Sequence, residues 1–165
     1  MKAGDFILTH GTAFYSRAIE REQRRRYPKN PELTHWTHAA LVVSDDGGLL
    51  QALGNGIVTG HVSDYSDYRT FSVDAVASTK SDRDRVLRFA WSQAGLKYDW
   101  VDIASIEMAL VTRIKVTFET EGHYICSGFV ARCLERTDAI FPRTAQHMMP
   151  ADLAAYFGGC PSCGK

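Results

Sequence analysis

The chain has 165 residues, a mass of 18.4 kDa and 45% hydrophobic residues, enough for one compact domain with its own core. Its 19 Lys and Arg residues balance 19 Asp and Glu residues, and a formal net charge of zero argues against proteins that bind nucleic acid or membrane surfaces through excess positive charge. Eight Phe, seven Tyr and three Trp residues, with only 23% charged residues, exclude a disordered chain.

No stretch of the sequence approaches the ~20 apolar residues that a membrane-spanning helix needs. The best apolar segments are residues 39–43 and 103–111, and Glu107 interrupts the second. The first five residues reach an acid before any apolar core and carry no small-residue cleavage site, so they do not predict a secretory signal. We therefore expect a cytoplasmic protein with no stable membrane insertion and no nucleic-acid partner.

The first half of the chain predicts a small sheet and one helix. Five segments have the apolar or alternating pattern of β-strands: residues 6–8, 37–43, 49–53, 57–59 and 69–73. The second of them is apolar apart from its start, which is typical of a central strand. A helix is expected over residues 13–26, with its charged end solvated, and a loop over residues 28–32.

The second half predicts mainly helices. Ser81 is the expected cap of a helix that stops at Gly95. Four further elements are expected in chain order: a helix at 102–110, a strand at 113–118, a helix at 124–136 and a short helix opening at Pro150. These elements predict a single α+β domain over residues 1–157, followed by a tail at 158–165.

The four cysteines lie at positions 126, 133, 160 and 163. On one helix, Cys126 and Cys133 would lie ~10 Å apart along the axis, which is too far for a disulfide. Cys160 and Cys163 form a lone Cys-x-x-Cys near the C-terminus. We expect these two cysteines to lie in a solvated tail, because no second cysteine pair accompanies them. The alternative is half of a zinc site or a redox pair.

Cys126 is the first candidate for chemistry because it lies in the first turn of its expected helix. The helix dipole and the unpaired N–H groups there lower the pKa of a thiol. The backbone N–H groups of Cys126 and Ser127 are the expected donors for an oxyanion formed when the thiolate attacks a carbonyl. The alternative is structural: Cys126 shares a helix face with Phe129 and Val130, and free cysteine is often a small core residue.

His38 begins the expected central strand, a rigid place from which an imidazole can act as a base; an ordinary core or edge histidine is the alternative. If the turn over residues 44–47 has four residues, Val43 pairs with Gly48, and His38 and Gln51 become diagonal neighbours ~7 Å apart on one face. A change of one residue in turn length would move Gln51 to the opposite face. Gln51 orients the imidazole only in the first case.

Six short segments, in this order, resemble one known family: Gly4–Leu8, Trp36–Val43, Gln51–Ala52, Gly95–Asp99, Tyr124–Ser127 and Met149–Leu153. They are spread over nearly the whole chain. In the same order, they are similar to six motifs of that family: the opening strand, the Thr-His strand, Glu-Ala, Gly-x-x-Tyr-Asp, Tyr-x-Cys-Ser and Pro-x-Asp-Leu. The chain thus resembles the YiiX-like group of circularly permuted NlpC-type proteins, which are papain-like cysteine hydrolases. In such proteins the histidine strand precedes the cysteine helix, as it does here.

The resemblance implies an α+β, papain-like fold with a central antiparallel sheet packed against helices, and an enzyme that needs no cofactor or metal. It implies Cys126 as nucleophile, His38 as base and Gln51 as the residue that orients the imidazole. The implied reaction is cleavage of an amide bond in a peptide or cell-wall peptide through an acyl-enzyme. The family usually carries Glu where Gln51 stands; a neutral amide can fill this role, and Asp64 or Asp67 is the alternative acid.

Three other functions fit the same residues. Relatives of the permuted fold include lipid acyltransferases of the lecithin:retinol type, so an acyltransferase or thioesterase using the same pair is the nearest alternative. A zinc site could instead use four residues: His35, His38, His123 and Cys126. His35 and His38 at a strand start would send their rings to opposite faces, which counts against zinc. A non-catalytic binding module is the third, indicated only by the replacement at Gln51.

Overall fold

The computed structural model describes residues 1–11, 14–76, 79–96, 126–137 and 139–158. The helix expected at 102–110, the strand expected at 113–118 and nearly all of the expected tail lie outside the described residues. The described part is an α+β arrangement of one antiparallel sheet and several helices, as the sequence predicts. None of its helices is both long and apolar enough to cross a membrane.

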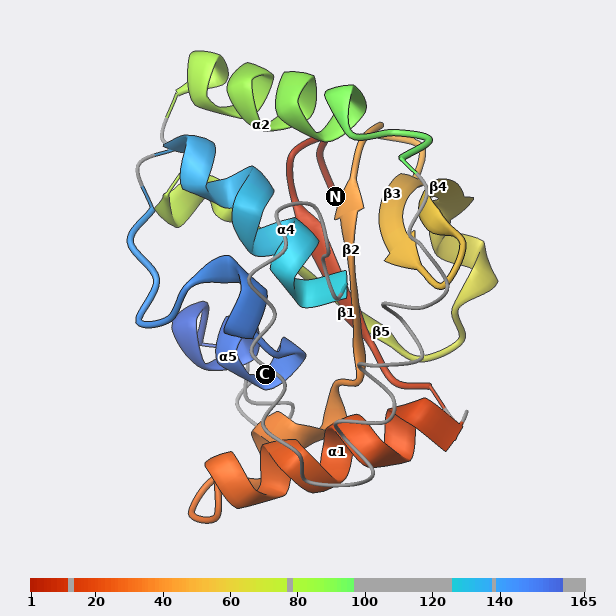
Figure 1. The fold of residues 1–165 in the computed structure, drawn as a ribbon. Helices are drawn as coiled ribbons and strands as arrows, with labels where there is room; N and C mark the ends of the chain where they lie inside the picture. The colour runs from red at the N-terminus through yellow and green to blue at the C-terminus, as the bar shows by residue number, and fades with distance from the viewer. Residues whose placement is uncertain (12–13, 77–78, 97–125, 138, 159–165) are drawn as a thin grey trace.

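The sheet has five antiparallel strands in the order β4-β3-β2-β1-β5 (Figure 1). The strands are β1 (Phe6–Thr9), β2 (His38–Val42), β3 (Gly48–Leu53), β4 (Gly56–His61) and β5 (Tyr68–Phe71). The prediction that the apolar segment at 37–43 is central is confirmed, since β2 lies third of five. The strand expected over 69–73 is shorter, because Val73–Ala75 already forms a 3-10 turn, η3.

The turn between β2 and β3 has the four residues on which the register prediction depended. Val43 N–H donates to Gly48 O at 2.8 Å, and Leu41 pairs with Leu50 in the ladder. Gly47 has φ of 101°, a left-handed conformation that glycine adopts without strain. The predicted register is therefore confirmed, and it places position 38 and position 51 on the same face of the sheet.

The described helices are α1 (Phe14–Arg26), α2 (Lys80–Ser92), α4 (Cys126–Leu134) and α5 (Pro150–Tyr156). The expected cap at Ser81 is wrong. The Thr79 hydroxyl accepts from Asp82 N–H at 3.2 Å and the Asp82 carboxylate accepts from Thr79 N–H at 3.0 Å, a reciprocal capping box that starts α2 two residues earlier. Pro150 opens α5, as predicted.

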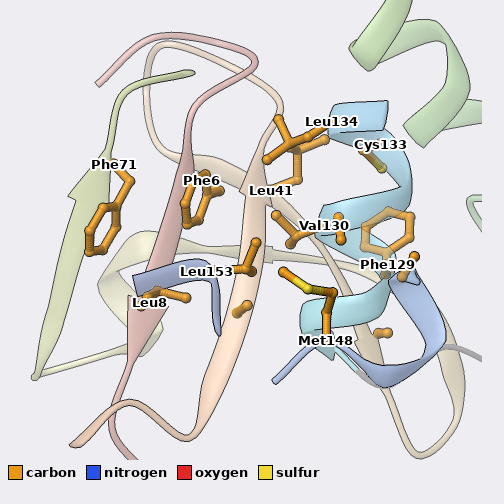
Figure 2. Close-up of a cluster of buried hydrophobic side chains, with 14 of the residues drawn as sticks. Phe6, Leu8, Leu41, Phe71, Phe129, Val130, Cys133, Leu134, Met148 and Leu153 are labelled. Carbon is orange, nitrogen blue, oxygen red and sulfur yellow. The ribbon is translucent and has the colours of Figure 1, made fainter. Parts of the chain in front are cut away.

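The main core lies between one face of the sheet and α2, α4 and α5 (Figure 1). Phe6 stacks on Phe71 within the sheet, and Phe129 and Leu134 of α4 are fully buried in the same cluster (Figure 2). The opposite face carries a smaller apolar cluster: Ile7, Ala40, Val42 and Leu49, with Val62 and Tyr65 packed on it. β2 therefore contributes alternate residues to two apolar clusters, which explains its continuous apolar sequence.

The charged end of α1 is only partly solvated. Arg24 and Arg25 make exposed ion pairs, as the sequence predicts for this run. Gln23, in contrast, is fully buried, donates to Trp36 O at 2.8 Å and accepts from Ala151 N–H at 2.7 Å. It thereby ties α1 to α5 and to the segment that precedes β2. That segment includes the 3-10 helix η1 (Pro31–His35), which begins inside the expected loop.

Candidate active site

Cys126 is the first residue of α4, and α4 packs against β2 and β3. Tyr124 and Ile125, expected to begin this helix, lie outside the described residues. The Ser127 hydroxyl donates to Met148 O at 2.6 Å, which fixes this end of α4 to the segment before α5. Cys126 is 9% exposed as a residue, so it lies almost entirely away from water.

His38 and Gln51 meet through their side chains, as the register predicted. His38 Nε2 lies 2.8 Å from Gln51 Oε1. The ladder pairs between β2 and β3 are Leu41–Leu50 and Val42–Leu49, next to the turn, so this side-chain bond joins the two strands at their far ends. With the carboxamide oxygen on Nε2, that nitrogen carries a proton, and Nδ1 is the nitrogen left for another partner.

Cys126 also interacts with the imidazole of His38. The thiol and the imidazole are each other's hydrogen-bond and charge partners, although α4 and β2 are almost 90 positions apart in the chain. Burial, the largest single influence, raises the pKa of the Cys126 thiol, but the His38 charge and hydrogen bond and two backbone hydrogen bonds together bring this pKa below its ordinary value. Burial likewise lowers the pKa of His38, and the charge and hydrogen bond of Cys126 together with the Gln51 hydrogen bond more than reverse this, so the pKa of His38 is raised. Both directions favour a thiolate–imidazolium pair.

Two backbone N–H groups support the same charge state. The N–H groups of Ala39 and Ser127 donate to the Cys126 sulfur, and each lowers the pKa of the thiol. The Ser127 hydroxyl is occupied by Met148 O, so only the backbone of Ser127 serves the sulfur. Of the two N–H groups expected to hold an oxyanion, that of Ser127 therefore lies at the sulfur.

Cys133 provides an internal comparison on the same helix. Like Cys126 it is buried and free, which agrees with the prediction that the two do not pair. Burial raises the pKa of the Cys133 thiol far above its ordinary value, and the charge of Arg136 offsets this only slightly. Two buried thiols seven residues apart thus have pKa values shifted in opposite directions, because only Cys126 has His38 and the two backbone N–H groups as partners.

Tyr65 is a residue of this site that the sequence did not single out. Its hydroxyl donates to Gln51 Oε1, the same atom that accepts from His38. Its ring stacks on the imidazole, with centroids 5.9 Å apart and planes 29° apart. Tyr65 follows the 3-10 helix η2 (Val62–Asp64), and no local pattern in the sequence marks it, because its place depends on how that turn folds back over the sheet.

The other candidate acids have different partners. Asp67 Oδ2 lies 2.9 Å from His35 Nε2, and Asp64 Oδ2 accepts from His61 N–H at 2.8 Å. Gln51 is thus the residue that contacts His38 Nε2, whereas Asp67 contacts His35 and Asp64 contacts His61.

The four candidate zinc ligands are not gathered at one point in the described part of the chain. His35 stacks on His10, with ring centroids 4.6 Å apart, and bonds to Asp67. His38 bonds to Gln51 and to Cys126, and His123 lies outside the described residues. Among described residues, no group of three or more His, Cys, Asp or Glu side chains could hold a metal ion.

Comparison with protein-family models gives no match to this chain, and comparison with curated proteins finds no relative. The function proposed below therefore rests on the residues and contacts of the chain itself.

Proposed function

We propose that this protein is a cysteine hydrolase that cleaves an amide bond, with Cys126 as nucleophile, His38 as general base and Gln51 as the residue that orients the imidazole. We also propose that the α+β arrangement is a permuted papain-like fold, with the histidine strand before the cysteine helix. The observation that carries the proposal is the mutual contact of Cys126 and His38, with opposite pKa shifts that favour the charged pair.

The proposed reaction begins with transfer of the thiol proton from Cys126 to Nδ1 of His38. The thiolate attacks the carbonyl carbon of the amide, and the carbon–oxygen electron pair moves onto oxygen. The tetrahedral intermediate collapses when the leaving nitrogen takes the proton from His38, which releases an amine and leaves a thioester on Cys126. His38 then takes a proton from water, hydroxide adds to the thioester, and release of the acid returns the proton to the sulfur.

Gln51 supports this cycle without a charge. Its oxygen accepts from Nε2, which keeps Nδ1 aimed at the sulfur and stabilises the imidazolium. A hydrogen bond to a charged donor contributes about 1.5 to 3 kcal/mol, less than a buried carboxylate would add by Coulombic attraction. The proposal therefore includes a weaker stabilisation of the imidazolium than a Cys-His-Glu site would have.

The test is alkylation of the protein by iodoacetamide across pH, with modified sites located by peptide mass spectrometry. Four cysteines are present, so each must be followed separately. Cys126 is expected to react fastest at neutral pH, with an apparent pKa below the ~8.5 of a free thiol. In His38→Ala that advantage is expected to shrink, since the charge and hydrogen bond of His38 no longer offset burial of the thiol.

Cys133→Ala is the matched control, because it removes the other buried thiol of α4 and leaves Cys126 and His38 in place. It is expected to leave the alkylation of Cys126 unchanged. Equal and slow alkylation of Cys126 in the wild type and in His38→Ala would overturn the proposal. Mass detection of an acyl group on Cys126 after mixing with p-nitrophenyl acetate, and its loss or transfer to an added amine, distinguishes a hydrolase from an acyltransferase.

A further inference from the structure

The carboxamide of Gln51 is held at its oxygen by two donors. Oε1 accepts from His38 Nε2 at 2.8 Å and from the Tyr65 hydroxyl. Gln51 is 4% exposed, so bulk water has little access to these groups. The orientation of this amide therefore depends on its protein neighbours.

A neutral amide at this position has a weakness that a carboxylate lacks. The two oxygens of a carboxylate are equivalent, so a half-turn of the group changes nothing. A half-turn of the Gln51 carboxamide would place its NH₂ group on His38 Nε2. Two N–H donors would then face each other, and the imidazolium would lose its acceptor. A site that uses Gln needs something that keeps the oxygen on the imidazole.

The nitrogen end of the amide lies beside Gly60. A Cβ atom at Gly60 would lie 2.5 Å from Gln51 Nε2, so the absence of a side chain makes room for the NH₂ group. The same point lies 3.5 Å from Asp64 Oδ2. A carboxylate near this end favours an N–H donor there and disfavours a carbonyl oxygen. The oxygen is thereby directed to the other end, toward His38 and Tyr65.

Tyr65 is itself anchored by a network around η2. The His61 ring and the Asp64 carboxylate cap this turn, and Tyr65 N–H donates to Val62 O at 3.2 Å. Val62 N–H donates to Gly47 O at 2.9 Å, and His61 Nε2 lies 2.9 Å from Asp46 O. These contacts fix the turn to the loop between β2 and β3, the strands that carry His38 and Gln51.

We propose that Tyr65 is a positioning residue that acts through Gln51, and that Gly60 provides the space this arrangement needs. The inference rests on the proposed function of Cys126 and His38 and adds a fourth member to their site. The Tyr65 hydroxyl holds the amide plane of Gln51 in line with Nε2, while Gly60 and Asp64 determine which end of the amide faces the imidazole. A neutral residue thereby takes the place that a carboxylate fills by charge.

The first test is Tyr65→Phe, which keeps the ring on His38 and removes only the hydroxyl. Alkylation of Cys126 by iodoacetamide at neutral pH is expected to slow by about 3- to 10-fold, the effect of one hydrogen bond, and the pH profile to move upward. Tyr68→Phe is the matched control, because Tyr68 is an exposed tyrosine of β5. It is expected to leave the alkylation rate and the pH profile unchanged. Thermal unfolding of each variant shows whether the fold is kept.

Testing Tyr65→Phe also in a Gln51→Glu protein distinguishes a positioning role of Tyr65 from a purely structural one. In Gln51→Glu the acceptor is symmetric, so Tyr65→Phe added to it is expected to change the alkylation rate by less than about 2-fold. An equal effect of Tyr65→Phe in both backgrounds would overturn the inference. So would a wild-type rate and pH profile in Tyr65→Phe itself.

Gly60→Ala tests the proposed role of Gly60 in making room for the Gln51 amide. It also keeps the inference testable if Tyr65→Phe does not fold. The backbone of Gly60 is not in the left-handed region, so the substitution acts by displacing the Gln51 amide. It is expected to slow alkylation of Cys126, whereas Gly54→Ala, which meets no atom within 4 Å, is not. If Cys126 in Gly60→Ala is alkylated with the rate and pH profile of the wild type, the proposed role of Gly60 is overturned. If wild-type Cys126 itself reacts as an ordinary thiol, the proposed function fails; if it reacts fast and these variants match it, only the inference fails.

Discussion

Replacement of Gln51 by Leu tests the proposed role of the amide most directly. Leucine has a similar volume but no acceptor, so His38 Nε2–H would be left without the partner that now lies 2.8 Å away. At 4% exposure, water has little access with which to replace it. The change therefore removes a hydrogen bond and leaves the packing nearly intact.

The magnitude follows from the charge states of the pair. The charged form, thiolate with imidazolium, and the neutral form, thiol with imidazole, hold the same number of protons, and Gln51 stabilises only the imidazolium. Loss of a hydrogen bond to a charged donor costs about 1.5 to 3 kcal/mol. At about 1.4 kcal/mol for each factor of ten, the ratio of charged to neutral form falls by about 10- to 150-fold.

The assay is the rate of iodoacetamide alkylation of Cys126 at neutral pH and its pH profile. In Gln51→Leu the neutral-pH rate is expected to fall by up to the factor above, and the thiolate to form only at higher pH. Gln93→Leu, at the C-cap of α2, is the matched control, because it makes the same change in a glutamine that does not contact His38 in the described structure. If Gln51→Leu has the same unfolding transition as the wild type and its Cys126 is alkylated at the wild-type rate, the proposed role of Gln51 is refuted.

Three further predictions concern the buried acid, its tyrosine partner and metal. Asp152 is 2% exposed and bonds to Arg26 and to Tyr27, so Asp152→Ala is expected to lower the free energy of unfolding by about 3 to 5 kcal/mol in denaturant titrations. Burial, and then the bond to Asp152, raises the pKa of Tyr27 to about 12. The stability that the protein gains from this shift should be complete below pH 10.0 and be lost as the pH rises from 10.0 through about 12. An ultraviolet titration of Tyr27→Phe should lack the ionisation step near pH 12. Dialysis against EDTA is expected to leave alkylation of Cys126 unchanged, since His38 is its partner; slower alkylation that zinc restores would contradict this.

The elements that the sequence predicted well are those with a strong local signal. The apolar run of β2, the turn that pairs Val43 with Gly48 and the proline that opens α5 each depend on residues close together in the chain. The capping signal of α2 is also local, but it is ambiguous: Thr79 and Ser81 are each followed three residues later by an aspartate. Only the folded chain distinguishes them.

The candidate site shows the same division. The four-residue turn, predicted from Ser44 to Gly47, is enough to bring Gln51 beside His38, because side chains alternate between the two faces of a strand. The contact of Cys126 with His38 is different, since it joins a helix and a strand distant in the chain. The sequence supplied two candidate groups, and their packing supplied the contact that shifts both pKa values.

What the sequence determined by itself is the set of local conformations and the chemistry that each side chain can perform. The tertiary structure decided which of these groups meet. Gln23 stands in a charged run yet is fully buried, and Tyr65 has no distinguishing neighbours yet shares an acceptor atom with His38. Neither placement is encoded within a few residues, because each results from packing between elements far apart in the chain, where burial and hydrogen bonding are set.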